Sequence, residues 1–190
     1  AQTAMWHLAE ALCRWIAPIL SFTAEEIWEN LPGTRERSVF LSSWYGDLPA
    51  EIADSNLGNA FWDEVITVRQ AVNRALEARR AAGDLRGSLD AEVTLYAEPG
   101  LFNRLEQLGS ELRFVLITSE ATLKPRAEAP ADIVESDVAG LAVAVAVSSH
   151  EKCERCWHRR PDVGDSREHP TLCTRCIDNI EGPGEHRQYA

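Results

Sequence analysis

Four of the chain's five cysteines lie in two C-x-x-C pairs close to the end of the sequence. Cys153 and Cys156 form the first pair and Cys173 and Cys176 the second, with sixteen residues between the pairs. Two residues between cysteines let a tight turn direct both sulfurs to one point, and two such turns complete a tetrahedron of thiolates around Zn²⁺. Because four sulfurs leave no position open for water, the spacing predicts one structural zinc ion and no catalytic metal.

Two disulfides and a redox C-x-x-C are the alternatives to zinc. Disulfides suit a secreted protein, but the chain does not open on a signal-peptide pattern, and the fifth cysteine, Cys13, stands alone. A redox motif normally occurs once, near a βαβ pattern, and not as a matched pair. We therefore favour zinc, and we interpret Cys13 as a small apolar side chain in the core of a helical region.

The composition describes an ordinary globular protein with an acidic surplus. The chain has 190 residues and a net charge of −11, which disfavours nucleic-acid binding because phosphate affinity comes largely from Lys and Arg. The charge is uneven, however: residues 69–86 hold five arginines against Glu77 and Asp84. The longest apolar run, 141–147, is far shorter than the roughly 20 residues of a membrane span. We expect no membrane association and a cytoplasmic location.

Three stretches have the spacing of amphipathic helices, and they cover 1–20, 21–33 and 59–83. In the second, Thr23 and Glu26 have the spacing of a capping box. The long third helix is expected to be capped by Asn59 and to end at Gly83. The apolar stripe of the first helix consists of Met5, Leu8, Leu12, Trp15 or Ile16, and Ile19. The stripe of the third consists of Phe61, Val65, Val68, Val72 and Leu76.

The pattern changes after the long helix. Alternation predicts strands at 89–97, 112–119 and 140–149, and proline and glycine bound a helix at 99–109. The Pro/Ala/acidic stretch 120–137 is expected to be a loop. Before the long helix, 38–45 is expected to be extended and 46–56 a loop. The fold class is therefore α+β, with a helical portion, a small strand–helix–strand–strand subdomain and a C-terminal four-cysteine zinc module.

The cysteine module must fold around its metal, because about forty residues with few apolar side chains bury too little surface alone. His158, His169 and His186 are expected to be exposed polar residues and not ligands, since four cysteines already complete the site. No phosphate-binding loop, dinucleotide turn or nucleophile elbow occurs, so no catalytic residue is proposed. The core candidates of the module are Trp157, Val163, Leu172 and Ile177.

Basic and aromatic side chains supply the candidates for RNA contact. The arginines of the long helix form either a solvated face or an edge that meets phosphates. Those of the cysteine module either neutralise the thiolate charge or present a nucleic-acid surface with a tryptophan that can stack on a base. The candidates are Arg69, Arg74, Arg80, Arg155, Trp157, Arg159, Arg160 and Arg175.

These residues resemble the C-terminal region of bacterial isoleucyl-tRNA synthetases. The K-C-x-R-C-W-H opening of the family's zinc tail stands here at 152–158, and the second C-x-R-C stands at 173–176. The stretch WIAPILSFTAEEIW at 15–28 is similar to the helical anticodon-binding domain of the synthetases for isoleucine, valine and leucine. The tail distinguishes the isoleucine enzyme from the rest of that group.

The resemblance implies that the chain recognises tRNA(Ile) and holds one structural Zn²⁺. It divides the chain into the C-terminal part of a helical anticodon-binding domain at 1–88, a small α+β subdomain at 89–150 and a zinc module at 151–190. Isoleucine activation with ATP, and removal of mischarged valine, belong in this family to domains whose motifs do not occur here. We therefore expect a monomeric fragment of a longer polypeptide, not catalytic by itself.

A stand-alone zinc module acting on DNA or on protein is the alternative. Formamidopyrimidine-type DNA glycosylases end in a similar four-cysteine finger. Those enzymes place a helix-two-turn-helix before the finger, whereas strands are predicted at that place in this chain.

Overall fold

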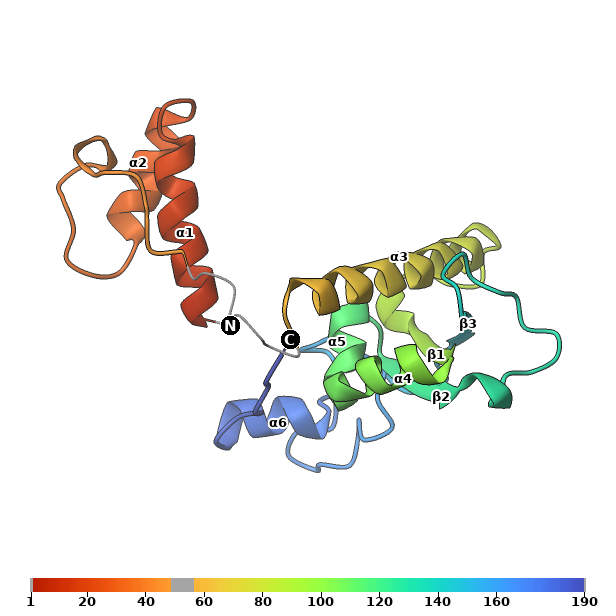
Figure 1. Cartoon of the computed structure of the whole chain (residues 1–190). Coiled ribbons are helices and arrows are strands. Elements are labelled where there is room, and N and C mark those ends of the chain that lie inside the picture. The colour runs from red at the N-terminus through yellow and green to blue at the C-terminus, as the bar shows by residue number, and fades with distance from the viewer. Residues whose placement is uncertain (1, 49–56, 190) are drawn as a thin grey trace. The chain divides into compact units, whose positions relative to one another are not determined.

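The computed structural model describes residues 2–48 and 57–189 (Figure 1). The chain divides into two compact units, 1–55 and 56–190, and each is described by itself. The finer division into parts at 1–88, 89–150 and 151–190 stays a prediction. No helix among the described residues combines the length and the hydropathy that a bilayer crossing requires.

The first unit is a pair of helices with a short 3-10 turn. Helix α1 spans Gln2–Ile16, α2 spans Ser21–Asn30 and the turn η1 spans Val39–Leu41. Pro18 follows α1, and the backbone turns back there through a bond from Leu20 N–H to the carbonyl of Ile16. The small core of the unit consists of Cys13, Ala17, Ala24, Trp28 and Val39.

Cys13 is buried, as expected, and its Sγ donates to the carbonyl of Ala24 at 3.1 Å. The apolar stripe predicted for the first helix is not buried, however. Helix α1 turns Cys13 toward α2, where its small side chain allows close approach, and Ala11 is also buried. The predicted stripe is left 45% to 82% exposed at Met5, Leu8, Leu12, Trp15 and Ile19.

Two local predictions in this unit are wrong. Thr23 lies inside α2 and does not cap it, because the helix begins at Ser21 after Leu20, which makes no side-chain capping bond. Residues 38–45 contain a 3-10 turn and no strand among the described residues, since no neighbouring strand offers partners. The hydroxyl of Ser38 accepts from Phe40 N–H at 3.3 Å and begins that turn. Most of the loop expected at 46–56 lies outside the described residues.

Helix α3, Asn59–Ala81, begins the second unit and confirms the long helix. Its predicted stripe is buried at all five positions in the main core of the unit. Gly58, and not Asn59, is the N-cap. Gly83 follows with φ 84° and donates to the carbonyl of Arg80 while Asp84 donates to that of Arg79, the paired bonds of a Schellman end.

A three-stranded sheet packs with α3. The strands are β1 (Ala91–Ala97), β2 (Glu120–Pro125) and β3 (Leu141–Val147), in the order β2-β1-β3. Strand β1 is parallel to β2 and antiparallel to β3. The strands predicted at 89–97 and 140–149 are therefore confirmed, and so is the α+β class.

The connection from β1 to β2 is helical. It consists of α4 (Pro99–Leu105), the 3-10 segment η3 (Glu106–Glu111) and α5 (Leu112–Leu116). The predicted strand at 112–119 is therefore wrong, and the strand lies at 120–125, within the stretch expected to be a loop, which also contains η4 (Arg126–Glu128). The reason is the helical spacing of four buried leucines, Leu105, Leu108, Leu112 and Leu116.

Candidate zinc centre and nucleic-acid interface

The two C-x-x-C pairs meet at one point in the second unit. The four Sγ atoms of Cys153, Cys156, Cys173 and Cys176 all lie within 4.8 Å of one another, and Cys156 Sγ lies 3.8 Å from Cys173 Sγ. A tetrahedron of sulfurs about 2.3 Å from Zn²⁺ has edges of about 3.8 Å. A disulfide would need about 2.05 Å, so the cysteines are free thiols placed as a set of four metal donors.

Each pair is shaped by a turn that follows its first cysteine. In the first turn, Trp157 N–H donates to the carbonyl of Cys153 at 2.9 Å, and Trp157 adopts a left-handed φ of 66°. In the second turn, Cys173 is the N-cap of helix α6 (Thr174–Glu181). Cys176 N–H returns to the carbonyl of Cys173 at 2.9 Å. These turns direct both side chains of each pair inward.

The surroundings shift the pKa of Cys156 and that of Cys173 in opposite directions. Burial alone would raise the pKa of Cys156, but hydrogen bonds from His158 and Arg175 lower it to about 5. Burial, with the nearby negative charge of Cys156, raises the pKa of Cys173 to about 12, and burial also raises that of Cys176. A divalent cation would supply the charge needed to keep all four sulfurs as thiolates. The donor set therefore fits Zn²⁺.

The packing around the sulfurs is small. Val163 and Leu172 contact the cysteine cluster, as predicted. Trp157 is 61% exposed, so its assignment to the core of the module is wrong. Among the described residues, the group that could hold a metal ion contains cysteines and no histidine. The prediction that His158 is exposed is also wrong, since its ring is buried and meets the edge of Phe114 at 5.7 Å.

Comparison with known proteins gives the family. The family described as "Anticodon-binding domain of tRNA ligase" matches residues 1–95, half of the chain. The chain belongs to this family. The family described as "Zinc finger found in FPG and IleRS" matches residues 151–179, which include all four cysteines. This match agrees with a four-cysteine group that can bind one zinc ion.

Relatives in the family are similar to the chain along its whole length. It is 59% identical over 189 residues to an isoleucine–tRNA ligase of Pseudomonas paraeruginosa and 58% identical to that of Alcanivorax borkumensis. It is 53% identical over 188 residues to the isoleucine–tRNA ligase of Methylococcus capsulatus. The alignments cover 99–100% of this chain but 20% of each relative, so the chain spans about a fifth of the relatives' length.

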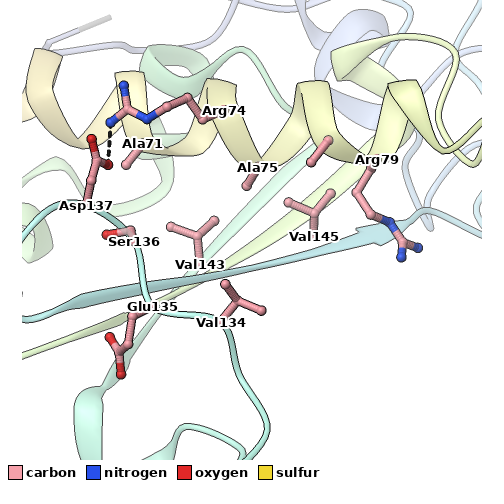
Figure 2. Close-up of a pocket in the computed structure, with 11 residues that line it drawn as sticks. Ala71, Arg74, Ala75, Arg79, Val134, Glu135, Ser136, Asp137, Val143 and Val145 are labelled. Carbon is pink, nitrogen blue, oxygen red and sulfur yellow. Dashed lines mark hydrogen bonds and ion pairs between the residues drawn. The ribbon is translucent and has the colours of Figure 1, made fainter.

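Of the three candidates in α3, Arg74 and Arg80 are exposed and ion-paired, and Arg69 is half-buried. Arg74 forms an ion pair with Asp137, and Arg80 pairs with Glu77 one turn before it. The ion pairs of α3 arginines among the described residues involve Arg74, Arg79 and Arg80 and not Arg69. Figure 2 shows the Arg74–Asp137 pair at the rim of a groove of about 470 Å³ between α3 and β3. Its apolar walls include Ala75 and Val143.

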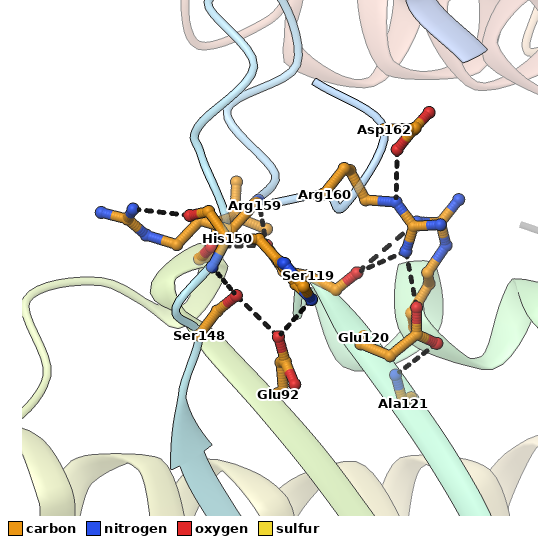
Figure 3. A network of polar contacts seen from close by, with 11 residues as sticks. Glu92, Ser119, Glu120, Ala121, Ser148, His150, Arg159, Arg160 and Asp162 are labelled. Atoms are coloured by element: carbon orange, nitrogen blue, oxygen red, sulfur yellow. Dashed lines mark hydrogen bonds and ion pairs between the residues drawn. The ribbon is translucent and has the colours of Figure 1, made fainter. Parts of the chain in front are cut away.

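Three arginine candidates of the cysteine module form ion pairs with carboxylates. Arg159 pairs with Asp90 at 2.8 Å, and Arg160 with Glu120 at 2.5 Å, as Figure 3 shows for the second pair. Arg175 pairs with Glu185 at 2.8 Å. Burial would lower the pKa of Arg175, but the bond to Cys156 and the charge of Glu185 raise it above its ordinary value. Five of the eight candidate residues are thus engaged by carboxylates.

The candidates outside such pairs in the module lie at its first turn. Trp157 projects its ring with Lys152 Nζ 5.5 Å from the ring centroid. Arg155 is exposed and donates from Nη1 to Cys176 Sγ at 3.6 Å. This turn therefore joins an exposed aromatic ring and two cations to the candidate metal centre.

The sequence did not indicate the residues against which the cysteine module packs. Phe114 of α5 has the guanidinium carbons of Arg113, Arg175 and Arg187 at 4.5, 5.1 and 3.9 Å from its ring. Burial, with the positive charge of Arg160, lowers the pKa of Arg113. No local pattern could have indicated this group, because its members come from segments up to 74 residues apart.

Proposed function

We propose that the chain binds the anticodon stem-loop of tRNA(Ile) and that it does so as part of an isoleucine–tRNA ligase. The observation that carries the proposal is the joint presence of an anticodon-binding domain at 1–95 and, farther along, a finger of the isoleucine-enzyme type with four convergent sulfurs. The relatives named isoleucine–tRNA ligase, similar over the full chain, support the choice of amino acid.

In this proposal Cys153, Cys156, Cys173 and Cys176 are the ligands of one structural Zn²⁺. The metal supplies the cross-link that gives the module its shape, since its own apolar core is limited to a few side chains. Trp157 stacks on an unpaired base of the anticodon loop, and Arg155 and Lys152 approach the neighbouring phosphates.

The long helix contributes less than the sequence pattern suggests. Arg69 is half-buried and is in no ion pair among the described residues, while Arg74 and Arg80 would have to leave carboxylates to meet a phosphate. With a net charge of −11, the chain alone should bind RNA weakly. We assign amino-acid activation to none of its residues, and charging of tRNA by this chain alone should be undetectable. We expect it to act as a monomer.

A DNA-binding finger is the second reading, because the matching finger family is shared with FPG proteins. The anticodon-binding match over the first half of the chain favours tRNA.

The test is binding to a synthetic tRNA(Ile) anticodon stem-loop, followed by anisotropy at several salt concentrations. We expect binding that weakens with salt and is lost when the loop bases are permuted within the same stem. Trp157→Ala should weaken binding by about 1–3 kcal/mol. Trp157→Phe, which keeps an aromatic ring at the same position, is the matched control and should retain most of the binding. Equal binding to the permuted loop, or to duplex DNA, would overturn the proposal.

A further inference from the structure

Arg159 directly follows the first turn of the cysteine module and reaches into the sheet. Its backbone N–H donates to Ser119 Oγ at 2.6 Å, and Ser119 is fully buried between α5 and β2. Its side chain donates from Nε to Asp90 Oδ1 at 2.8 Å and from Nη1 to the carbonyl of His150 at 3.0 Å. Three groups of one residue are thus held by the body of the second unit.

Arg160 repeats the arrangement on the neighbouring strand. Its Nη1 donates to Glu120 Oε2 at 2.5 Å and to the carbonyl of Ser119 at 3.4 Å. Its Nε lies 3.7 Å from Asp162 Oδ1 (Figure 3). Ser119 therefore receives both arginines, one at its hydroxyl and one at its carbonyl.

These contacts continue into the turn that carries the exposed tryptophan. Lys152 and Arg159 form an antiparallel bridge across this turn, and Cys153 N–H donates to the carbonyl of His158 at 2.9 Å. Trp157 lies inside the closed loop with a left-handed backbone, which a tryptophan keeps only where its surroundings impose it. The arginines close the loop against a buried serine and so restrict where the ring can point.

The guanidinium groups of Arg159 and Arg160 are both bound to carboxylate and carbonyl oxygens in this arrangement. The side chain of Arg159 is 30% exposed and that of Arg160 is 23% exposed, and their carboxylate partners come from outside the module, before β1 and at the start of β2. A phosphate would have to displace a carboxylate and a carbonyl at each arginine. Charge-assisted bonds of this kind are stronger than neutral ones, so such an exchange brings little gain.

We propose that Arg159 and Arg160 are positioning residues. They hold the first cysteine turn on the sheet so that Trp157 meets RNA in one orientation, and they make no contact with RNA themselves. This inference rests on the proposed function, and it replaces the direct RNA contact that their charge predicted.

The partners of the arginines allow a test in which the two readings differ in sign. Asp90→Asn removes a negative charge, so a directly contacting Arg159 would be released and RNA binding would tighten or stay equal. If the arginine positions the turn, the same change weakens binding to the anticodon stem-loop by about tenfold, because a charge-assisted bond is lost. Glu120→Gln should weaken binding through Arg160 to a smaller extent, because Glu120 is more exposed.

Glu168→Gln is the matched control. It makes the same change of charge within the module, at an exposed carboxylate with no hydrogen bond or ion pair in the part of the chain that the structure describes. Binding should be equal or slightly tighter. Zinc content should stay near one per chain in all three variants. If Asp90→Asn lost zinc, the comparison of Glu120→Gln with Glu168→Gln would decide whether the arginines position the turn or contact RNA.

Two further readouts separate this inference from the proposed function. The slope of log affinity against log salt should stay unchanged in Asp90→Asn and in Arg159→Ala, whereas loss of a direct phosphate contact lowers it by about 0.7–0.9. Hydrogen exchange without RNA should be faster at residues 152–159 in Asp90→Asn. Faster exchange with unchanged RNA binding would overturn the inference alone, and absence of RNA binding by the parent chain would overturn the proposed function.

Discussion

The two units of the chain reach stability by different means. The second unit has one continuous apolar core that joins α3, all three strands and the α4–α5 connection, with the cysteine cluster beside it. The described part of the first unit has a small apolar core of five residues, Trp28 among them, and leaves many large apolar side chains exposed. Helical spacing is present in both. The difference shows that an amphipathic pattern predicts a helix reliably but does not say which of its faces will be covered.

A buried ion cluster supplements the small core of the first unit. Glu10 is almost fully buried and accepts from Arg14 at 2.6 Å and from Arg35 at 3.0 Å. Both guanidinium groups stack on Trp28, at 4.6 and 4.7 Å from its ring. Burial would raise the pKa of Glu10, but the two arginines lower it below its ordinary value. The ion cluster therefore ties helix α1 to the segment after α2 across the small core.

Removal of zinc should have the largest effect and should separate the two units most clearly. Chelation, or Cys173→Ser, should disorder residues 151–189, because structural zinc sites supply about 10–16 kcal/mol of folding free energy. Helices α1, α2 and α3 should keep their order, since none of them contributes a metal ligand. Elemental analysis and residue-resolved hydrogen exchange measure both. A metal-free module that keeps its protection would contradict the role of the metal.

Leu76→Ala tests the continuous core of the second unit. The side chain is buried on the predicted stripe of α3, so its truncation should lower the free energy of unfolding of that unit by about 2–5 kcal/mol. Zinc content should not change at temperatures where the unit remains folded. Denaturant unfolding with hydrogen exchange would measure the loss, and an equal loss of protection in α1 would show that the units unfold together.

Glu10→Gln tests the ion cluster of the first unit. The change leaves two buried guanidinium groups without their carboxylate and should cost about 1–3 kcal/mol of stability. Since the pKa of Glu10 is lower when folded, its stabilisation is present above the unfolded value and is lost as the pH falls through the folded value. In the unsubstituted chain, α1 and α2 should therefore lose hydrogen-exchange protection below a pH of about 4.5.

The glutamine variant is the control for the acid effect. When hydrogen exchange is followed from neutral pH downward, Glu10→Gln should lack the part of the acid-induced loss of protection that comes from the Glu10 carboxylate. The same acid dependence in Glu10→Gln and in the parent would assign the loss to other groups.

Leu8→Ala should have the smallest effect and completes the comparison with Leu76→Ala. It makes the same truncation on a predicted stripe, but at a side chain that is exposed in α1, so the stability should change by less than about 0.5 kcal/mol. Thermal unfolding of the chain in dilute solution measures it. A loss comparable to that of Leu76→Ala would show that the stripe of α1 is buried in solution.

Much of the second unit was predictable because its signals are local. The stripe of α3, the glycine stop at Gly83 and the alternation in β1 and β3 all describe the structure. The segment after α4 was not predictable in this way. Its β-branched and aromatic residues favour a strand, but the leucines bury themselves with helical spacing, and the short β2 is paired with the central strand β1 alone.

The spacing of the cysteines by itself determined the metal-binding character of the module, because two-residue spacers constrain where sulfurs can point. Helix content, the α+β class and the family resemblance followed from local pattern in the same way. Only the tertiary structure decided which charged side chains are paired with other residues of the protein. Asp90 and Ser119 lie 69 and 40 residues from Arg159, and nothing in the local sequence marks them as its partners. The sequence shows that a charged side chain is present. Whether that charge can bind a ligand depends on whether the fold places an opposite charge beside it, and long-range packing determines this.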